Sequence, residues 1–228
     1  MKTYAFIFAR GGSKGVPNKN IKNMCGKPLI AYSIEMAKSI KNFKKIFVST
    51  EDKNIALIAK EYGAEIIPRP IDLAKDNSPE FDSWKHAIKW LKDLGDDFDV
   101  FISLPTTSPL RSKSDINQCL VSLDEKTDIV LGITEASRNP FFNIVKKNQK
   151  GFIEILIKSN NNFSRRQDAP SVFDITTVSY VCRPEFIINS DAIFDGKVKG
   201  VQIPADRALD IDTELDWKFV EFMMEKND

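Results

Sequence analysis

The sequence is poor in the side chains on which many enzymes depend. It holds a single histidine, His86, among 228 residues, which excludes most histidine-based catalysis and most zinc sites. Its three cysteines, Cys25, Cys119 and Cys182, lie far apart without metal-ligand spacing, so we expect reduced thiols in a cytoplasmic protein. Chemistry in this chain must therefore rest on carboxylates, lysines, arginines and, where a metal takes part, a hard cation.

The sequence also lacks an excess of either charge and a long apolar run. Lys and Arg number 33 against 32 Asp and Glu, whereas a nucleic-acid or membrane-surface binder normally carries a basic face. No apolar stretch approaches the ~20 residues of a membrane helix, and the first residues show no signal-peptide pattern. Hydrophobic residues still make up 42% of the chain, which excludes intrinsic disorder. We therefore expect a folded protein with neither nucleic-acid nor membrane partners.

Short apolar runs alternate with helical patterns through the first part of the chain. The run at 4–9 stops at a glycine-rich stretch, as is typical of a strand buried on both faces of a parallel sheet. The same strand–helix unit then repeats, with strands predicted at 4–9, 45–50, 65–67, 100–104 and 128–132 and helices at 29–41, 52–62, 79–94 and 113–123. This order predicts a doubly wound, mostly parallel α/β sheet, which binds ligands beyond the carboxyl ends of its strands.

The pattern changes over about residues 139–183. Short apolar pieces there predict a small β-rich insertion within a single domain of residues 1–228, with strands at 141–146, 152–157 and 176–182. A last helix is predicted at about 214–226, and Thr213 with Asp216 can form a capping box at its start. Exposed apolar strand edges favour pairing with another chain, so we expect a homodimer formed through the insertion.

The first motif with chemical content follows the first predicted strand and spans residues 9–20, ARGGSKGVPNKN. Three glycines within five positions let the backbone approach a ligand and expose its N–H groups. Three cations accompany the glycines: Arg10, Lys14 and Lys19. Backbone donors beside cations favour a polyphosphate-binding loop, and the alternative is a solvated basic turn after a strand.

The second motif is the pair Asp210 and Asp212 near the end of the chain. In extended backbone, residues i and i+2 project to the same side, so the two carboxylates can share a hard cation such as Mg²⁺. The alternative is that Asp212 or Thr213 is only the N-cap of the last helix and Asp210 is a surface charge.

The third motif, residues 104–111 (LPTTSPLR), ends a predicted strand in a loop rich in hydroxyls and prolines that can line a pocket. Pro109 can equally set up the next helix, whose cap is then Ser112 or Ser114. Arg69, with Pro70 beside it and Asp76 further on, is a weaker repeat of this pattern after another strand.

Taken in order, the motifs resemble those of the CMP-sialic acid synthetases, the acylneuraminate cytidylyltransferases. The resemblance covers most of the chain and runs through ARGGSKGVPNKN, KPLIAYSIE, VSTE, IPRPIDLAKD, TSPLR, RRQDAP and DIDTELD. It implies a Rossmann-like nucleotidyltransferase fold with a dimerisation insertion, and Mg²⁺-dependent coupling of CTP to the anomeric hydroxyl of an acidic nonulosonic sugar, with release of pyrophosphate. The related Kdo cytidylyltransferases are one alternative, and a non-catalytic nucleotide-binding regulatory domain is another.

The resemblance also implies a role for individual residues. It places Arg10, Lys19 and Asp212 in catalysis and gives Mg²⁺ to Asp212 together with Asp210. The positions that it implies for nucleotide binding are Ala9, Gly11, Gly12, Lys14, Asn20, Arg69 and Ser78. Those that it implies for the sugar side are Thr106, Thr107, Arg166, Gln167 and Tyr180. For Arg165–Arg166 the alternative is a surface basic pair.

Two departures from the family pattern lie on the implied sugar side. Pro105-Thr106 stands where the family commonly has Gln-Pro, and Thr176-Thr177 stands where it has Asn-Gly. The nucleotide half therefore matches the family well, whereas sialic, legionaminic and related acids, and Kdo, all remain open as the sugar.

Overall fold

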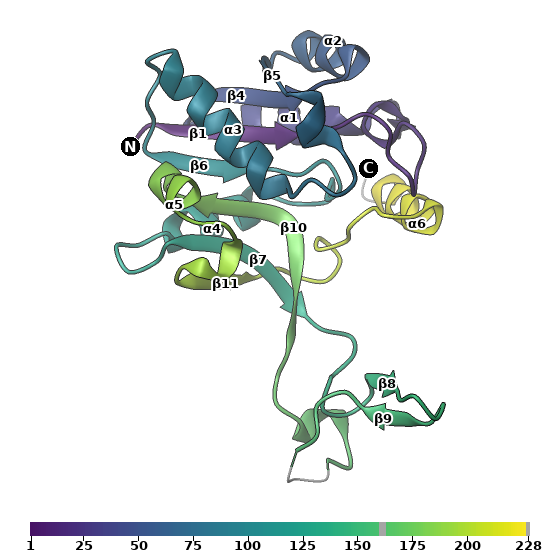
Figure 1. Cartoon of the computed structure of the whole chain (residues 1–228). Helices are drawn as coiled ribbons and strands as arrows, with labels where there is room; N and C mark the ends of the chain where they lie inside the picture. The colour runs from purple at the N-terminus through teal and green to yellow at the C-terminus, as the bar shows by residue number, and fades with distance from the viewer. Residues whose placement is uncertain (160–162, 227–228) are drawn as a thin grey trace.

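A seven-stranded sheet forms the centre of the protein, whose computed structural model describes residues 1–159 and 163–226 (Figure 1). Its strands, in spatial order, are β11 (Val198–Gln202), β7 (Ile129–Glu135), β10 (Phe173–Cys182), β6 (Val100–Ser103), β1 (Thr3–Phe8), β4 (Phe43–Thr50) and β5 (Glu65–Pro68). Every neighbouring pair is parallel except the two that involve β10. The predicted mostly parallel α/β sheet is confirmed.

Helices cover both faces of this sheet. Along β1 the side chains alternate, so that Ala5 and Ile7 pack under one layer while Tyr4 and Phe6 pack under the other. The first layer holds α1 (Leu29–Lys38), α2 (Lys53–Glu61) and α4 (Lys113–Ser122), and the second holds α3 (Glu80–Asp93) and α5 (Pro184–Asn189). The last helix, α6 (Glu214–Glu225), packs on the residues after β1 through Val16 and Trp217. None of the described helices is both long and apolar enough to cross a membrane.

Short elements complete the fold. They are η1 (Lys19–Ile21), β2 (Asn23–Met24), β3 (Lys27–Pro28), η2 (Ile71–Ala74), β8 (Val145–Lys147), β9 (Ile153–Ile155), η3 (Arg166–Asp168) and η4 (Ile193–Asp195). Ser112 caps α4 and Thr213 caps α6, each in a reciprocal capping box. Of the two caps that the sequence allowed for α4, Ser112 is therefore the one used.

The predicted β-rich insertion is an arm rather than a layer of the body. Figure 1 shows β7 and β10 running out of the sheet together and ending at the small hairpin of β8 and β9. Its tip and stem expose large apolar side chains, among them Phe152, Ile153, Phe173 and Ile175. These residues have no covering layer within the described part of the chain.

Three strand predictions in this region need correction. The piece at 176–182 belongs to the central sheet, because β10 returns along β7 and inserts antiparallel beside β6. Phe141 and Phe142 lie in a turn, where the Asn139 side chain accepts from the Phe141 N–H, so that strand β8 begins only at Val145. The piece at 152–157 forms a strand only over β9.

Candidate active site

A cavity of about 390 Å³ opens at the carboxyl ends of the parallel strands. Most of the predicted site residues line it, namely Arg10, Lys14, Lys19, Asn20, Arg69, Ser78, Thr106, Thr107 and Asp212. They come from the segments that follow β1, β5 and β6 and from the segment that precedes α6. The sheet therefore brings together motifs that are far apart in the sequence, as ligand sites in such folds require.

The glycines after β1 allow this loop to run close to its neighbours. A side chain at Gly15 would place its Cβ 1.9 Å from the Asp212 carbonyl oxygen, so only glycine fits there. Gly12 has a φ of +70°, in the left-handed region that favours glycine. The Gly11 N–H donates to Glu51 Oε1 at 2.7 Å and the Ala9 N–H to the Ser49 carbonyl at 3.1 Å. Both of these donors therefore already have partners within the protein.

The outer cations of the loop converge on one acid. Arg10 Nη1 lies 2.9 Å and Lys14 Nζ 2.5 Å from the carboxylate oxygens of Asp76. Hydrogen bonds from Lys14 and then Arg10 hold the pKa of Asp76 below its usual value. The Lys14 and Asp76 side chains are 77% and 51% exposed, and ion pairs this exposed contribute little stability. A phosphate group can therefore replace Asp76 at little cost.

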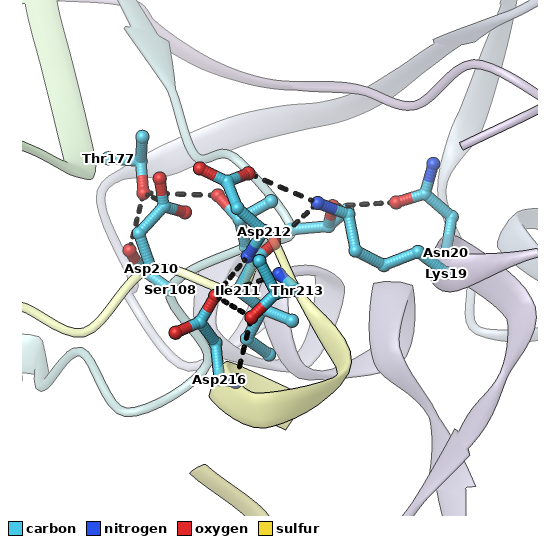
Figure 2. A network of polar contacts seen from close by, with 11 residues as sticks. Lys19, Asn20, Ser108, Thr177, Asp210, Ile211, Asp212, Thr213 and Asp216 are labelled. Atoms are coloured by element: carbon cyan, nitrogen blue, oxygen red, sulfur yellow. Dashed lines mark hydrogen bonds and ion pairs between the residues drawn. The ribbon is translucent and has the colours of Figure 1, made fainter. Parts of the chain in front are cut away.

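Lys19 is held more deeply than the other two cations. Its side chain is only 13% exposed, its ammonium donates to the Ile211 carbonyl, and Asp212 Oδ1 lies 3.7 Å away (Figure 2). The next residue, Asn20, donates to the Arg10 carbonyl at 2.9 Å and accepts from Thr106 Oγ1 at 2.7 Å. These two residues tie the first loop to the other two motifs.

The acidic pair does not serve as the cap of the last helix. Thr213, not Asp212, caps α6, since the Asp216 N–H donates to its hydroxyl. The Asp212 side chain is 75% exposed at the cavity, whereas Asp210 does not line the cavity and accepts a hydrogen bond from Thr177 at 2.9 Å (Figure 2). No group of three or more metal-binding side chains occurs among the described residues. Two carboxylates fit a Mg²⁺ ion that draws its remaining ligands from substrate phosphates and water.

Two arginines of the predicted motifs are buried and form hydrogen bonds within the protein. Arg69 is buried and donates from Nε to Ser49 Oγ at 3.2 Å and from Nη2 to the Ser49 carbonyl. Arg111 is 3% exposed and donates to Ser33 Oγ at 3.0 Å and to the Pro105 carbonyl. Burial lowers the pKa of Arg111 to about 9. Arg111 thus lies buried beneath the hydroxyl-rich loop 104–111 and holds it in place through the Pro105 carbonyl.

The sequence analysis missed several cavity residues, and one of them is an acid. Glu80, in the first turn of α3, lines the cavity and accepts a hydrogen bond from the Trp84 indole N–H at 3.0 Å. The Glu80 side chain is exposed to the cavity, but protein surrounds it on its other sides. The resulting desolvation raises the pKa of its carboxyl. In sequence it looked like a typical first-turn acid of a helix, which gave no sign of a pocket position.

The structure separates the remaining sugar-side residues from the cavity. Arg166 and Gln167 lie on the arm, in a second hollow of about 400 Å³ that also includes Asn139 and Pro170. Arg166 donates there to the Ala136 carbonyl. Tyr180 packs behind the cavity wall, with its ring 5.3 Å from that of Trp84, and burial raises the pKa of its hydroxyl.

Comparisons of sequence point to one family. The family model described as cytidylyltransferase matches residues 4–192. The chain is 37% identical to the post-translational flagellin modification protein B of Campylobacter coli, over 97% of this chain and 94% of that protein. It is 36% identical to the CMP-N,N'-diacetyllegionaminic acid synthase of Campylobacter jejuni, over 96% and 93%. The pseudaminic acid cytidylyltransferase of Campylobacter jejuni is 28% identical, over 100% and 98%.

Comparison of structure supports the fold. The structure of CMP:2-keto-3-deoxy-manno-octonic acid synthetase complexed with CTP matches with a TM-score of 0.74 at 17% identity, over 100% of both chains. The 4-diphosphocytidyl-2C-methyl-D-erythritol synthase of Anaerococcus prevotii matches with a TM-score of 0.65 at 15% identity, over 98% of each chain. At such identities the likeness shows the fold alone, and it confirms the predicted Rossmann-like α/β architecture.

Proposed function

This chain belongs to the cytidylyltransferase family, and on that basis we propose that it joins CTP to an acidic nonulosonic sugar, giving the CMP-sugar and pyrophosphate. The observation that carries the proposal is a cavity lined by Arg10, Lys14 and Lys19 together with the carboxylate of Asp212. Such a cavity suits a polyphosphate with a divalent cation. The sugar class is supported by the legionaminic and pseudaminic acids in the names of two relatives.

The chemistry of the proposed reaction is a substitution at phosphorus. The anomeric hydroxyl of the sugar gives its proton to water and its oxygen attacks the α-phosphate of CTP; the bond from this phosphorus to the oxygen that bridges it to the β-phosphate breaks, and pyrophosphate leaves. Such transfers need positioning and charge neutralisation more than covalent chemistry. Lys19, fixed by the Ile211 carbonyl, and Arg10 stabilise the charge that grows on pyrophosphate. One well-placed donor of this kind contributes about 3 kcal/mol.

We propose that Asp210 and Asp212 hold Mg²⁺ beside the triphosphate. When bound, the ion would neutralise phosphate charge and polarise the α-phosphate. Lys19 Nζ lies 3.7 Å from Asp212 Oδ1, so a cation and a proposed metal ligand stand next to each other in the cavity. Gly15 brings the phosphate-binding loop against the Asp212 backbone, so cations and carboxylates act on one group of atoms.

We propose that the sugar side is completed by the arm of a second copy. Arg166 and Gln167 lie in a hollow on the arm that shares no lining residue with the cavity. A guanidinium suits the carboxylate of an acidic sugar, because it binds carboxylates bidentately. Burial of the arm's exposed apolar residues, Phe152 and Ile153 among them, would favour the homodimer. Light scattering at micromolar concentration should give twice the chain mass, and a monomer would contradict this part of the proposal.

The decisive experiment measures pyrophosphate release with CTP and Mg²⁺ against a panel of sialic, legionaminic and pseudaminic acids, with Kdo as a separate arm. We expect turnover with at least one nonulosonic acid and formation of its CMP derivative by mass spectrometry. Turnover with Kdo alone would move the chain to the eight-carbon substrate. CTP binding without turnover on every acidic sugar would instead support a regulatory nucleotide-binding domain.

Because CTP is a cytoplasmic metabolite, we propose a cytoplasmic location.

A further inference from the structure

The hydroxyl of Thr177 joins two motifs of the site, the acidic pair and the loop 104–111. It donates to Asp210 Oδ1 at 2.9 Å, and Thr107 Oγ1 donates to it at 3.0 Å. Ser108 Oγ lies 2.6 Å away. A hydroxyl has one proton and two acceptor positions. Since the Thr177 proton goes to Asp210, Ser108 must donate its own proton, and the hydrogen-bonding capacity of Thr177 is then fully used (Figure 2).

The strand that carries Thr177 holds this hydroxyl in place. The pairing of β10 with β7 shifts register between Ile175 and Tyr180, so Thr177 lies in an irregular stretch with regular pairing on both sides. Irregularities of this kind re-aim side chains next to active sites. The buried guanidinium of Arg111 also donates to the Thr177 carbonyl at 3.3 Å, which restrains the backbone of the same residue.

The contact determines which oxygen of Asp210 is available. Oδ1 is occupied by Thr177, and among the described residues Oδ2 accepts no hydrogen bond. A carboxylate without such a contact rotates freely and presents either oxygen. Partners of this kind orient metal ligands, and their loss typically costs about 10- to 100-fold in metal affinity or activity.

We infer that Thr177 is a positioning residue, which holds Asp210 so that its free oxygen meets the divalent cation that accompanies CTP. This inference rests on the proposed function. It also gives a role to a departure from the family pattern, since the chain has threonine here where the resemblance leads one to expect glycine. The loop 104–111 takes part through Thr107 and Ser108, and this connects the sugar side to the acidic pair.

The test compares three variants of the full-length protein. Thr177→Val removes the hydroxyl while keeping the shape, Thr177→Ser keeps the hydroxyl, and Thr176→Val makes the same change one residue earlier on β10. Thr176 is a matched control because its hydroxyl accepts from the Val178 N–H at 3.4 Å and has no contact with Asp210. Mn²⁺ binding to the protein–CTP complex is followed by electron paramagnetic resonance, with thermal melting as the check on folding.

We expect Thr177→Val to weaken Mn²⁺ binding by about 10- to 100-fold, with Thr177→Ser and Thr176→Val near the wild type. Should the valine variant not fold, Thr177→Ala carries the same comparison. Unchanged Mn²⁺ affinity in a folded Thr177→Val protein would overturn the inference, and so would an equal loss in Thr176→Val. Mn²⁺ affinity does not depend on the sugar, so failure of the proposed function appears separately, as absence of a CMP-sugar product.

Discussion

Replacement of Lys19 by methionine separates a catalytic role from a structural one. Lys19→Met keeps most of the aliphatic stem and removes the ammonium, which donates to the Ile211 carbonyl and lies 3.7 Å from Asp212 Oδ1. Loss of a hydrogen bond from a charged donor costs about 1.5–3 kcal/mol. The ion pair adds less than about 1 kcal/mol, because the Asp212 side chain is 75% exposed. We expect the variant to fold with a free energy of unfolding lower by about 2–3 kcal/mol.

The effect of Lys19→Met on turnover should be larger than its effect on stability. A preorganised charge donor to the leaving pyrophosphate contributes about 2–4 kcal/mol to the transition state, or about 30- to 1,000-fold in kcat/KM. Pyrophosphate release is measured well below the melting temperature, beside a urea unfolding curve. Lys14→Met is the control for stability, because Lys14 pairs with Asp76 at an exposed position and should unfold like the wild type. Wild-type kcat/KM in Lys19→Met would refute the role in phosphate chemistry, whatever the stability loss.

Three further predictions test the metal site, a buried ion pair and an acid-sensitive cluster. Asp212→Asn and Asp210→Asn should fold normally yet lose most turnover, with partial recovery in excess Mn²⁺, and normal turnover in both would end the metal proposal. Arg207→Ala should lower the free energy of unfolding by about 2–3 kcal/mol, because the 2%-exposed Asp115 carboxylate loses the guanidinium that contacts it twice at 2.9 Å and keeps only its hydrogen bonds from Ser112; an unchanged urea midpoint would contradict this. Burial alone would raise the pKa of Asp96, but hydrogen bonds from neighbouring Lys and Tyr side chains outweigh it and hold the pKa well below its usual value. The ionised Asp96 carboxylate contributes its full stabilisation of the fold above about pH 4, and this stabilisation is lost as the pH falls through the lowered pKa. The difference in melting temperature between wild type and Asp96→Asn should therefore be largest near neutrality and shrink below about pH 4.

The parallel half of the fold could be predicted because burial on both faces leaves a direct sequence signal. The first strand, predicted at 4–9, is found at Thr3–Phe8, and Tyr4 to Ile7 are fully buried there. The helices after it were found to within a few residues, and α3, predicted at 79–94, spans Glu80–Asp93. The carboxyl ends of such strands meet at one edge, which is why loops after separate strands could be grouped into one site.

The antiparallel part could not be predicted from local pattern. Half of β10 lies in the arm, where Phe173 and Ile175 are exposed, and half lies in the core, where Val181 and Cys182 are fully buried. A strand that changes environment midway has no single alternation of polar and apolar residues along its length. The short α5 and the half-exposed β11 were missed for a related reason, since neither buries enough apolar surface to show a period.

The residues that support the site without lining its cavity could not be recognised from the sequence either. Arg111 has the appearance of a substrate-binding arginine, yet it is 3% exposed and bonded to Ser33 and the Pro105 carbonyl. Thr177 looked like a departure from a motif, and only the fold brings its hydroxyl to Asp210. Both depend on partners from other elements, which no local spacing encodes.

The glycine-rich loop 9–20 and the acidic pair are one structural unit, although Lys19 and Ile211 are 192 positions apart in the sequence. Gly15 has no room for a Cβ against the Asp212 carbonyl, and Lys19 donates to the carbonyl immediately before it. The two contacts fall on consecutive peptide groups, so the loop is positioned by the acidic segment as much as by the strand it follows. Neither glycine-rich turns nor paired aspartates are specific alone. Their direct contact is what supports the proposed site for a nucleotide and its cation.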